Sequence, residues 1–220
     1  MKEKKGKISL GVILTASVLF SIGLVAARIW WTDSLRYASL IWNLFLAWIP
    51  YGIALGVVHR RSWFRHPLVF YFTVAFWLIF FPNAPYLITD LFHLNQQPEV
   101  PLWYDLTLIF SFAWNGLVLG FVSLMHMEQE VQRRHGQRLG LLFSAVVLAL
   151  GAYGVFLGRY LRWNSWDLLV NPFSLLAHMA QMIRHPLHFP GVWGMTLLLS
   201  TLSGLIYLTL KSLGRKRLPG

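Results

Sequence analysis

The sequence FPNAPYLITDLFHL, residues 81–94, ends a long apolar segment with two prolines and several polar side chains. A proline removes a backbone donor and clashes with the carbonyl one turn earlier, so two prolines three residues apart break or kink a helix. In a membrane, the backbone groups freed by such a break need partners from the protein or from a water-filled cavity. Asn83, Asp90 and His93 lie beside this break. The stretch therefore predicts an interrupted membrane helix next to a polar pocket.

Composition places the chain among membrane proteins. Of its 220 residues, 56% are hydrophobic and 12% are charged, whereas about a quarter of the residues of soluble domains are charged. Eleven tryptophans fit a chain with many anchors at the membrane–water interfaces. The absence of cysteine excludes disulfides, thiolate zinc sites and cysteine nucleophiles. No zinc-binding spacing such as HExxH occurs, so the sequence indicates no metal site and identifies no cofactor.

Six apolar stretches reach the length of about 20 residues that a membrane-spanning helix needs. We therefore expect an all-α, polytopic transmembrane bundle forming a single integral membrane domain over residues 1–220. The expected spans are residues 8–27, 40–58, 67–88, 106–125, 139–157 and 192–210. The first stretch lacks a small-residue cleavage site, which favours a retained span over a cleaved signal peptide.

The basic residues predict how the chain lies in the membrane. Fourteen of the 19 lysines and arginines fall in segments on the side of the N-terminus, namely residues 2–7, 60–65, 133–138 and 211–217. Positive residues stay on the cytoplasmic side of short loops, so both termini are expected in the cytoplasm and the protein in the plasma (inner) membrane. The bilayer is then the main partner, with anionic lipids at these basic loops and no nucleic acid. Glu128 and Glu130 lie among basic residues, which predicts a solvated loop.

The last outer loop is expected to hold an amphipathic helix over residues 165–185, lying in the plane of the membrane and covering the outer face. Asn164 fits the N-cap position and Asp167 lies three residues further on. Phe173, Leu176, Ala180 and Ile183 would share the apolar face, opposite Ser174, His178, Gln181 and His185.

Glycines at four-residue spacing include the pairs Gly52/Gly56, Gly116/Gly120 and Gly154/Gly158. Such pairs allow helices to approach closely, so they favour a compact bundle.

The outer connections and the span ends beside them carry carboxylates, arginines and a histidine. Asp90 and His93 are three residues apart, as are Arg159 and Arg162, so each pair can share one helix face. We expect Asp90 to lie near at least one of these arginines. The candidate catalytic residues are Asp90, His93 and Asp105. The candidate substrate-binding residues are Asn83, Tyr86, Asn115, Arg159, Arg162, Asn164 and Asp167.

Each candidate also has a purely structural interpretation. Asp167 would complete a helix cap, Asn115 would join two helices, and the two arginines would reach lipid phosphates. His93 alone is typical of an interfacial histidine. Asn83 and Asp90 are harder to explain in this way, because polar groups inside a membrane are costly and usually functional.

Three blocks of sequence carry a resemblance. They are residues 81–94, residues 103–105 (WYD), and GRYLR at 158–162 followed by NSWD at 164–167. In these blocks, in length and in hydropathy, the chain resembles the bacterial DUF1361 family of multi-pass membrane proteins. The resemblance implies a membrane class and no particular activity.

Three functions fit these observations. The first is an enzyme or binding protein with an outward-facing polar pocket for a lipid-linked or extracytoplasmic anionic small molecule, in which arginines would hold the anionic group. The second is a small transporter, because broken helices often present backbone groups to a substrate. The third is a scaffold subunit whose outer polar cluster is only a network of ion pairs.

Overall fold

The computed structural model describes residues 9–96, 99–163, 165 and 170–215, and within these residues all regular structure is helical. The long helices are α1 (Leu10–Thr32), α2 (Ser39–His59), α3 (Pro67–Phe80), α5 (Leu102–His135), α6 (Gln137–Tyr160) and α9 (Pro190–Arg215). Shorter elements are α4 (Asn83–Tyr86), η1 (Leu87–His93), α8 (Pro172–Arg184) and η2 (Pro186–His188). Among these described residues, six segments are long and apolar enough to cross a membrane, counting residues 67–93 as one. The polytopic helical fold predicted from the sequence is confirmed.

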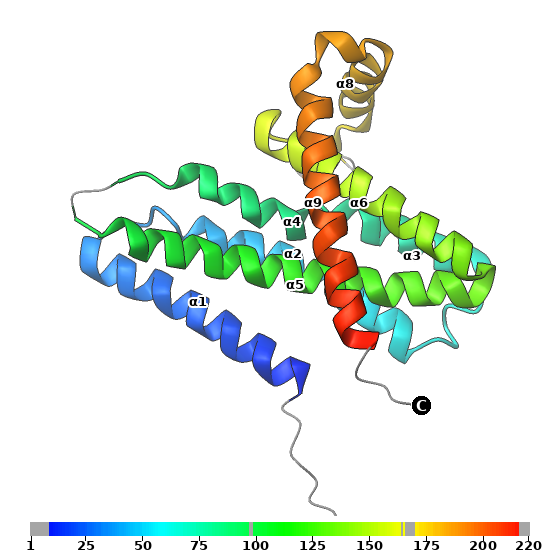
Figure 1. The fold of residues 1–220 in the computed structure, drawn as a ribbon, viewed down its shortest axis with the longest axis horizontal. Coiled ribbons are helices and arrows are strands. Elements are labelled where there is room, and N and C mark those ends of the chain that lie inside the picture. Colours follow the sequence, from blue (N-terminus) through cyan, green and yellow to red (C-terminus); the bar gives the residue numbers. More distant parts are fainter. Residues whose placement is uncertain (1–8, 97–98, 164, 166–169, 216–220) are drawn as a thin grey trace, which may run out of the picture.

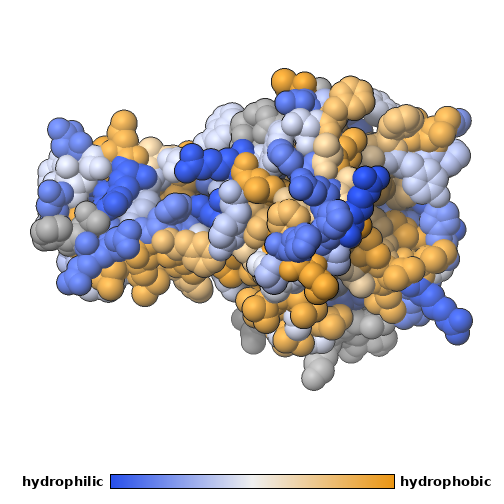
Figure 2. Space-filling model, turned by 90° about the horizontal axis from the view of Figure 1, so that it is seen from above, coloured by the Kyte–Doolittle hydropathy of each residue, from blue (hydrophilic) through white to orange (hydrophobic). Residues whose placement is uncertain are grey.

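The helices form a bundle around α5, which packs against α1, α2, η1 and α6 (Figure 1). In the same view α9 crosses α5 steeply and packs against α6, and α8 stands at the top of the picture beside the start of α9. We call the end of the bundle that holds Asp90 and Asp105 the Asp90 end, and the opposite end the Glu128 end. Many large apolar side chains of the long helices are exposed, and Figure 2 shows such hydrophobic areas along the lower edge of the molecule, as expected of a surface that contacts lipid.

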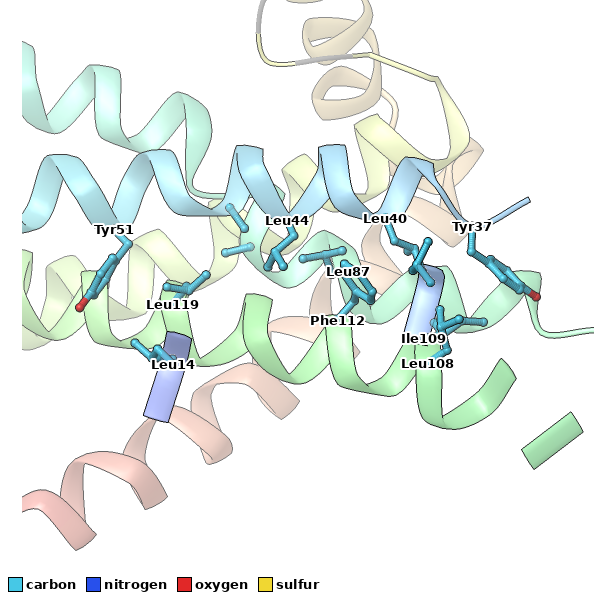
Figure 3. Close-up of a cluster of buried hydrophobic side chains, with 13 residues drawn as sticks. Leu14, Tyr37, Leu40, Leu44, Tyr51, Leu87, Leu108, Ile109, Phe112 and Leu119 are labelled. Carbon is cyan, nitrogen blue, oxygen red and sulfur yellow. The ribbon is translucent and has the colours of Figure 1, made fainter. Parts of the chain in front are cut away.

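Apolar side chains from several elements fill the centre of the bundle. Leu40 and Leu44 of α2, Phe112 of α5 and Leu87 of η1 point toward one another in Figure 3 and are almost completely buried. The interrupted segment therefore belongs to the core of the bundle rather than to a surface loop.

The third span is interrupted where the two prolines predict it. Helix α3 ends at Phe80, a turn follows at residues 81–82, and the chain continues as the single turn α4 and the 3-10 helix η1. Pro82 has no N–H, so the ladder of backbone hydrogen bonds cannot run through it.

Glycines of two neighbouring helices make room for this break. A Cβ atom on Gly116 of α5 would lie 2.6 Å from the carbonyl oxygen of Ala84, and one on Gly154 of α6 would lie 2.6 Å from Cγ of Pro82. Gly120, Gly151 and Gly158 are similarly close to Ala84, Phe81 and Tyr86. The pairs Gly116/Gly120 and Gly154/Gly158 noted in the sequence thus leave the space in which the broken segment packs against α5 and α6. Any larger residue at Gly116 or Gly154 would push it out of place.

Helix α5 is much longer than the expected span of residues 106–125. Its 34 residues extend over about 51 Å, beyond the roughly 30 Å of a hydrocarbon core. The sequence prediction placed the end of this span where polar residues begin. Those residues are good helix formers, so the helix continues beyond the predicted boundary.

This extension corrects the prediction for Glu128 and Glu130, which lie buried in α5 and not in a solvated loop. Glu128 accepts hydrogen bonds from Ser144 of α6 (2.7 Å), from Gln132, and from Tyr207 and Lys211 of α9. A carboxylate in the core is tolerated here because its oxygens are fully hydrogen-bonded and its charge is paired. Glu128 therefore ties α9 to the rest of the bundle.

The expected amphipathic helix of residues 165–185 corresponds to α8, which begins at Pro172. Leu175 and Met182 are buried against the bundle, whereas Phe173 and Ile183 are 85% and 60% exposed. The exposed residues belong to the face expected to contact lipid, and its position in a membrane stays a prediction. Asn164 and residues 166–169, which include Asp167, lie outside the described residues.

Candidate functional site: a buried cluster beside an apolar cavity

Asp90 of η1 and Arg159 of α6 form an ion pair at the Asp90 end. Nη2 of Arg159 lies 2.6 Å from Oδ1 of Asp90, and both side chains are about nine-tenths buried. This confirms the predicted pairing of Asp90 with one of the two arginines. Arg162 is exposed and has a left-handed backbone (φ 57°).

The guanidinium of Arg159 uses all three of its nitrogens. Nε donates to Oγ1 of Thr89 (2.8 Å), Nη1 donates to Nε2 of His93 (2.8 Å), and the group lies 4.3 Å from the centre of the Tyr86 ring. Because guanidinium only donates, Nε2 of His93 is the acceptor, which leaves the imidazole proton on Nδ1. His93 is exposed, so its imidazole is the part of the cluster that solvent reaches.

Asn43 of α2 completes the cluster. Its Nδ2 donates to Oδ2 of Asp90 (3.3 Å), the oxygen that Arg159 does not use. Sequence reasoning did not single out Asn43. The available signal was a lone amide inside the apolar second span, which indicates a polar partner on another helix.

Asn83 and Ser165 supply partners for backbone groups at the break. Nδ2 of Asn83 donates to the carbonyl oxygen of Phe80 (2.9 Å) and to Oγ of Ser165 (2.9 Å). Oγ of Ser165 in turn donates to the carbonyl oxygen of Ile79 (3.0 Å). The last carbonyls of α3 are thus satisfied by side chains, as the membrane environment demands. This gives Asn83 a structural role in addition to any role in binding.

Asp105 forms a separate ion pair, with Arg28 of α1. Nε and Nη2 of Arg28 donate to the two carboxylate oxygens at 2.7 and 3.2 Å, and both side chains are more than 95% buried. The sequence analysis named only Arg159 and Arg162 as candidates at this end and did not consider Arg28. Arg28 falls on the same side, at the end of the first span.

Tyr37 connects the two ion pairs. Its ring lies 4.6 Å from the guanidinium of Arg28, and its hydroxyl donates to the backbone oxygen of His93 (3.4 Å). Burial raises the pKa of the Tyr37 hydroxyl, and the nearby Asp105 carboxylate raises it further. Tyr37 therefore stays protonated and keeps this hydrogen bond over the physiological pH range.

Asn115 lies in a third location, between α1 and α5. Its Nδ2 donates to Oγ of Ser21 (3.0 Å) and to the carbonyl oxygens of Ser111 and Ser17 (2.9 and 3.3 Å). These bonds join two helices, as the structural interpretation of Asn115 proposed, and they do not bring it to the Asp90 cluster.

In the described part of the chain, no three histidine or carboxylate side chains lie close enough together to hold a metal ion. The arrangement of Asp90, Arg159, Thr89 and His93 is instead a hydrogen-bonded cluster with a nearly cancelled charge.

A cavity of about 450 Å³ lies directly beside this cluster. Its walls come from α2, α3, α6 and the break, and Leu175 and Met179 of α8 cover it. The lining side chains that carry a polar atom are Trp42, Asn43, Asn83, Tyr86, Tyr153, Trp163 and Ser165. Asn43 and Tyr86 belong to both the cavity wall and the cluster, so these two residues connect the cavity to the ion pair.

The fold and this site define a multi-pass α-helical membrane protein with a polar cluster and a cavity at a broken helix. The chain belongs to the family described as "Protein of unknown function (DUF1361)", whose model matches residues 42–206. The matched region contains the Asp90 cluster and all the residues lining the cavity, and it leaves out α1. No curated protein and no solved structure matches the chain.

Proposed function

We propose that this protein binds a lipid-linked or lipid-like amphipathic molecule in the cavity beside Asp90. The observation that carries the proposal is the distribution of polar groups: the walls are mainly apolar, and hydrogen-bonding side chains gather where the cavity meets the break in α3 and the Asp90–Arg159 pair. Small-molecule sites are typically apolar pockets of about 300–1,000 Å³ with a few polar groups that fix the orientation of the ligand. Asp90 and His93 remain the candidates for any acid–base chemistry on the bound molecule.

A scaffold role explains the ion pairs but gives no reason for a cavity at their side. A transporter would need a route to the Glu128 end. There the polar side chains around Glu128 are already used to hold α9.

Ligand binding is tested by narrowing the cavity from its exposed edge. Ala75 of α3 lines the cavity and is exposed, so Ala75→Trp fills space there without displacing buried residues. We expect the wild-type protein to co-purify with an amphiphile that mass spectrometry detects, and the variant to lose about nine-tenths of it. Ala26→Trp, at an exposed alanine of α1, is the matched control and should keep the ligand. Equal lipid content in all three proteins would contradict the proposal.

The same proposal places the Asp90 end outside the cell and the basic Glu128 end in the cytoplasm of a plasma-membrane protein. The distribution of lysine and arginine supports it, and the exposed basic residues at the Glu128 end would contact anionic lipids.

Reporter fusions test this orientation. Fusions after Arg61, Arg138 and Lys216 are expected to report the cytoplasm, and fusions after Gln97 and Arg184 the exterior, because positive loops are retained on the cytoplasmic side. Two or more fusions on the opposite side would contradict the six-span orientation.

A further inference from the structure

We infer that the cavity takes an amphiphile with one hydrocarbon chain and an uncharged, hydrogen-bonding head, which enters sideways from the bilayer. This inference rests on the proposed function and narrows the class of its ligand.

Among the residues that the structure describes, the lining of the cavity holds no charged side chain that could pair with an ionic head. Its polar groups are amides, hydroxyls and indoles. The charge of Arg159 is cancelled by Asp90 at 2.6 Å, and its guanidinium also donates to Thr89 and His93 and lies against the Tyr86 ring. An anionic head would have to displace Asp90 from this pair. An ionic group left unpaired in such a site is strongly disfavoured, whereas a hydroxyl can use the amides.

The two sides of the lining differ in chemistry. Asn43, Asn83, Tyr86 and Ser165 lie at the break and offer donors and acceptors. Away from the break, the lining is formed by side chains such as Ala75, Leu78 and Leu150. A molecule with a polar head and an apolar tail fits this arrangement, with its head at the break and its tail against the apolar side chains. The volume of about 450 Å³ lies in the lower part of the range for small-molecule sites, which favours one chain over two.

The apolar part of the cavity is open toward the surface that faces lipid. Three of the lining residues are exposed: Trp42 of α2 (54%), Leu150 of α6 (43%) and Ala75 of α3. All three lie within membrane-spanning helices, so the opening meets hydrocarbon. Helix α8 covers the cavity at the Asp90 end through Leu175 and Met179. A chain therefore enters most directly between α3 and α6, from the bilayer itself.

The test compares three amphiphiles of equal chain length with the full-length protein in phosphatidylcholine nanodiscs. They are a monoacylglycerol, an alkyl phosphate and an alkyltrimethylammonium salt, and binding is measured by native mass spectrometry. We expect the monoacylglycerol to bind about tenfold more tightly than either ionic compound, a difference of about 1.4 kcal/mol. Asn43→Leu should abolish most of this preference, because it removes an amide from the lining.

The variants separate this inference from the proposed function. If Ala75→Trp weakens binding of the alkyl phosphate and that compound binds as tightly as the monoacylglycerol, the cavity is a ligand site but the inferred head group is wrong. If Ala75→Trp and the Ala26→Trp control bind all three compounds like the wild type, the cavity is not the site and both proposals fail.

Discussion

Replacing Arg28 with methionine is expected to destabilise the protein more than almost any other single substitution. The change leaves the Asp105 carboxylate more than 95% buried without its cation, and breaking such a pair costs about 3–5 kcal/mol. Folded domains are stable by only about 5–15 kcal/mol, so a large drop in the melting temperature and in membrane abundance should follow.

The double variant Arg28→Met/Asp105→Leu distinguishes a lost charge from a lost contact. Exchanging a buried ion pair for apolar residues of similar size is often neutral, so the double variant should recover most of the melting temperature. Arg36→Met, which removes an exposed arginine from the following turn, is the matched control and should behave like the wild type. A double variant as unstable as Arg28→Met would mean that the charge pair is not the cause.

The interrupted third span could be predicted from the sequence because its cause is local. Two prolines three residues apart leave a helix no continuous hydrogen-bond ladder, and the hydrocarbon demands partners for the freed carbonyls. Asn83 is one of those partners, which the position beside the break suggested. The second partner, Ser165, lies 82 residues away and could not be assigned without the fold.

The pairing of charges was predicted correctly for Asp90 and missed for Asp105. Both arginines of the sequence GRYLR were recognised as partners, since they follow directly from an apolar span on the same side. Arg28 was equally available, but it lies at the end of a span outside the three resembling blocks. Which carboxylate meets which arginine depends on how α1 packs against α5, and that is a property of the packing rather than of either segment.

Glu128 was misassigned for a related reason. Its neighbours in sequence are basic and polar, which is typical of a surface loop, whereas its neighbours in space are Ser144 and two residues of α9. Hydropathy averages over a window and does not recognise a buried carboxylate whose partners come from distant helices.

The second large effect is expected for Asp90→Asn. Asparagine keeps the shape of the side chain and can still accept a hydrogen bond from Arg159, but it leaves a guanidinium that is nearly nine-tenths buried without a counter-charge. We expect a loss toward the lower end of about 3–5 kcal/mol, visible as a lower melting temperature in detergent. Asp33→Asn is the matched control, because Asp33 is exposed and its left-handed backbone (φ 50°) tolerates asparagine.

The double variant Asp90→Asn/Arg159→Leu tests whether the ion pair only stabilises the fold or also supports ligand binding in the cavity. Removing both charges should restore most of the stability, since no unpaired ion remains. Binding of the monoacylglycerol should nevertheless fall by about tenfold. The reason is that the pair positions two lining residues: Asn43 donates to Asp90, and the Tyr86 ring lies against Arg159. If the double variant recovers its stability and binds the monoacylglycerol as the wild type does, the ion pair stabilises the fold but plays no part in ligand binding.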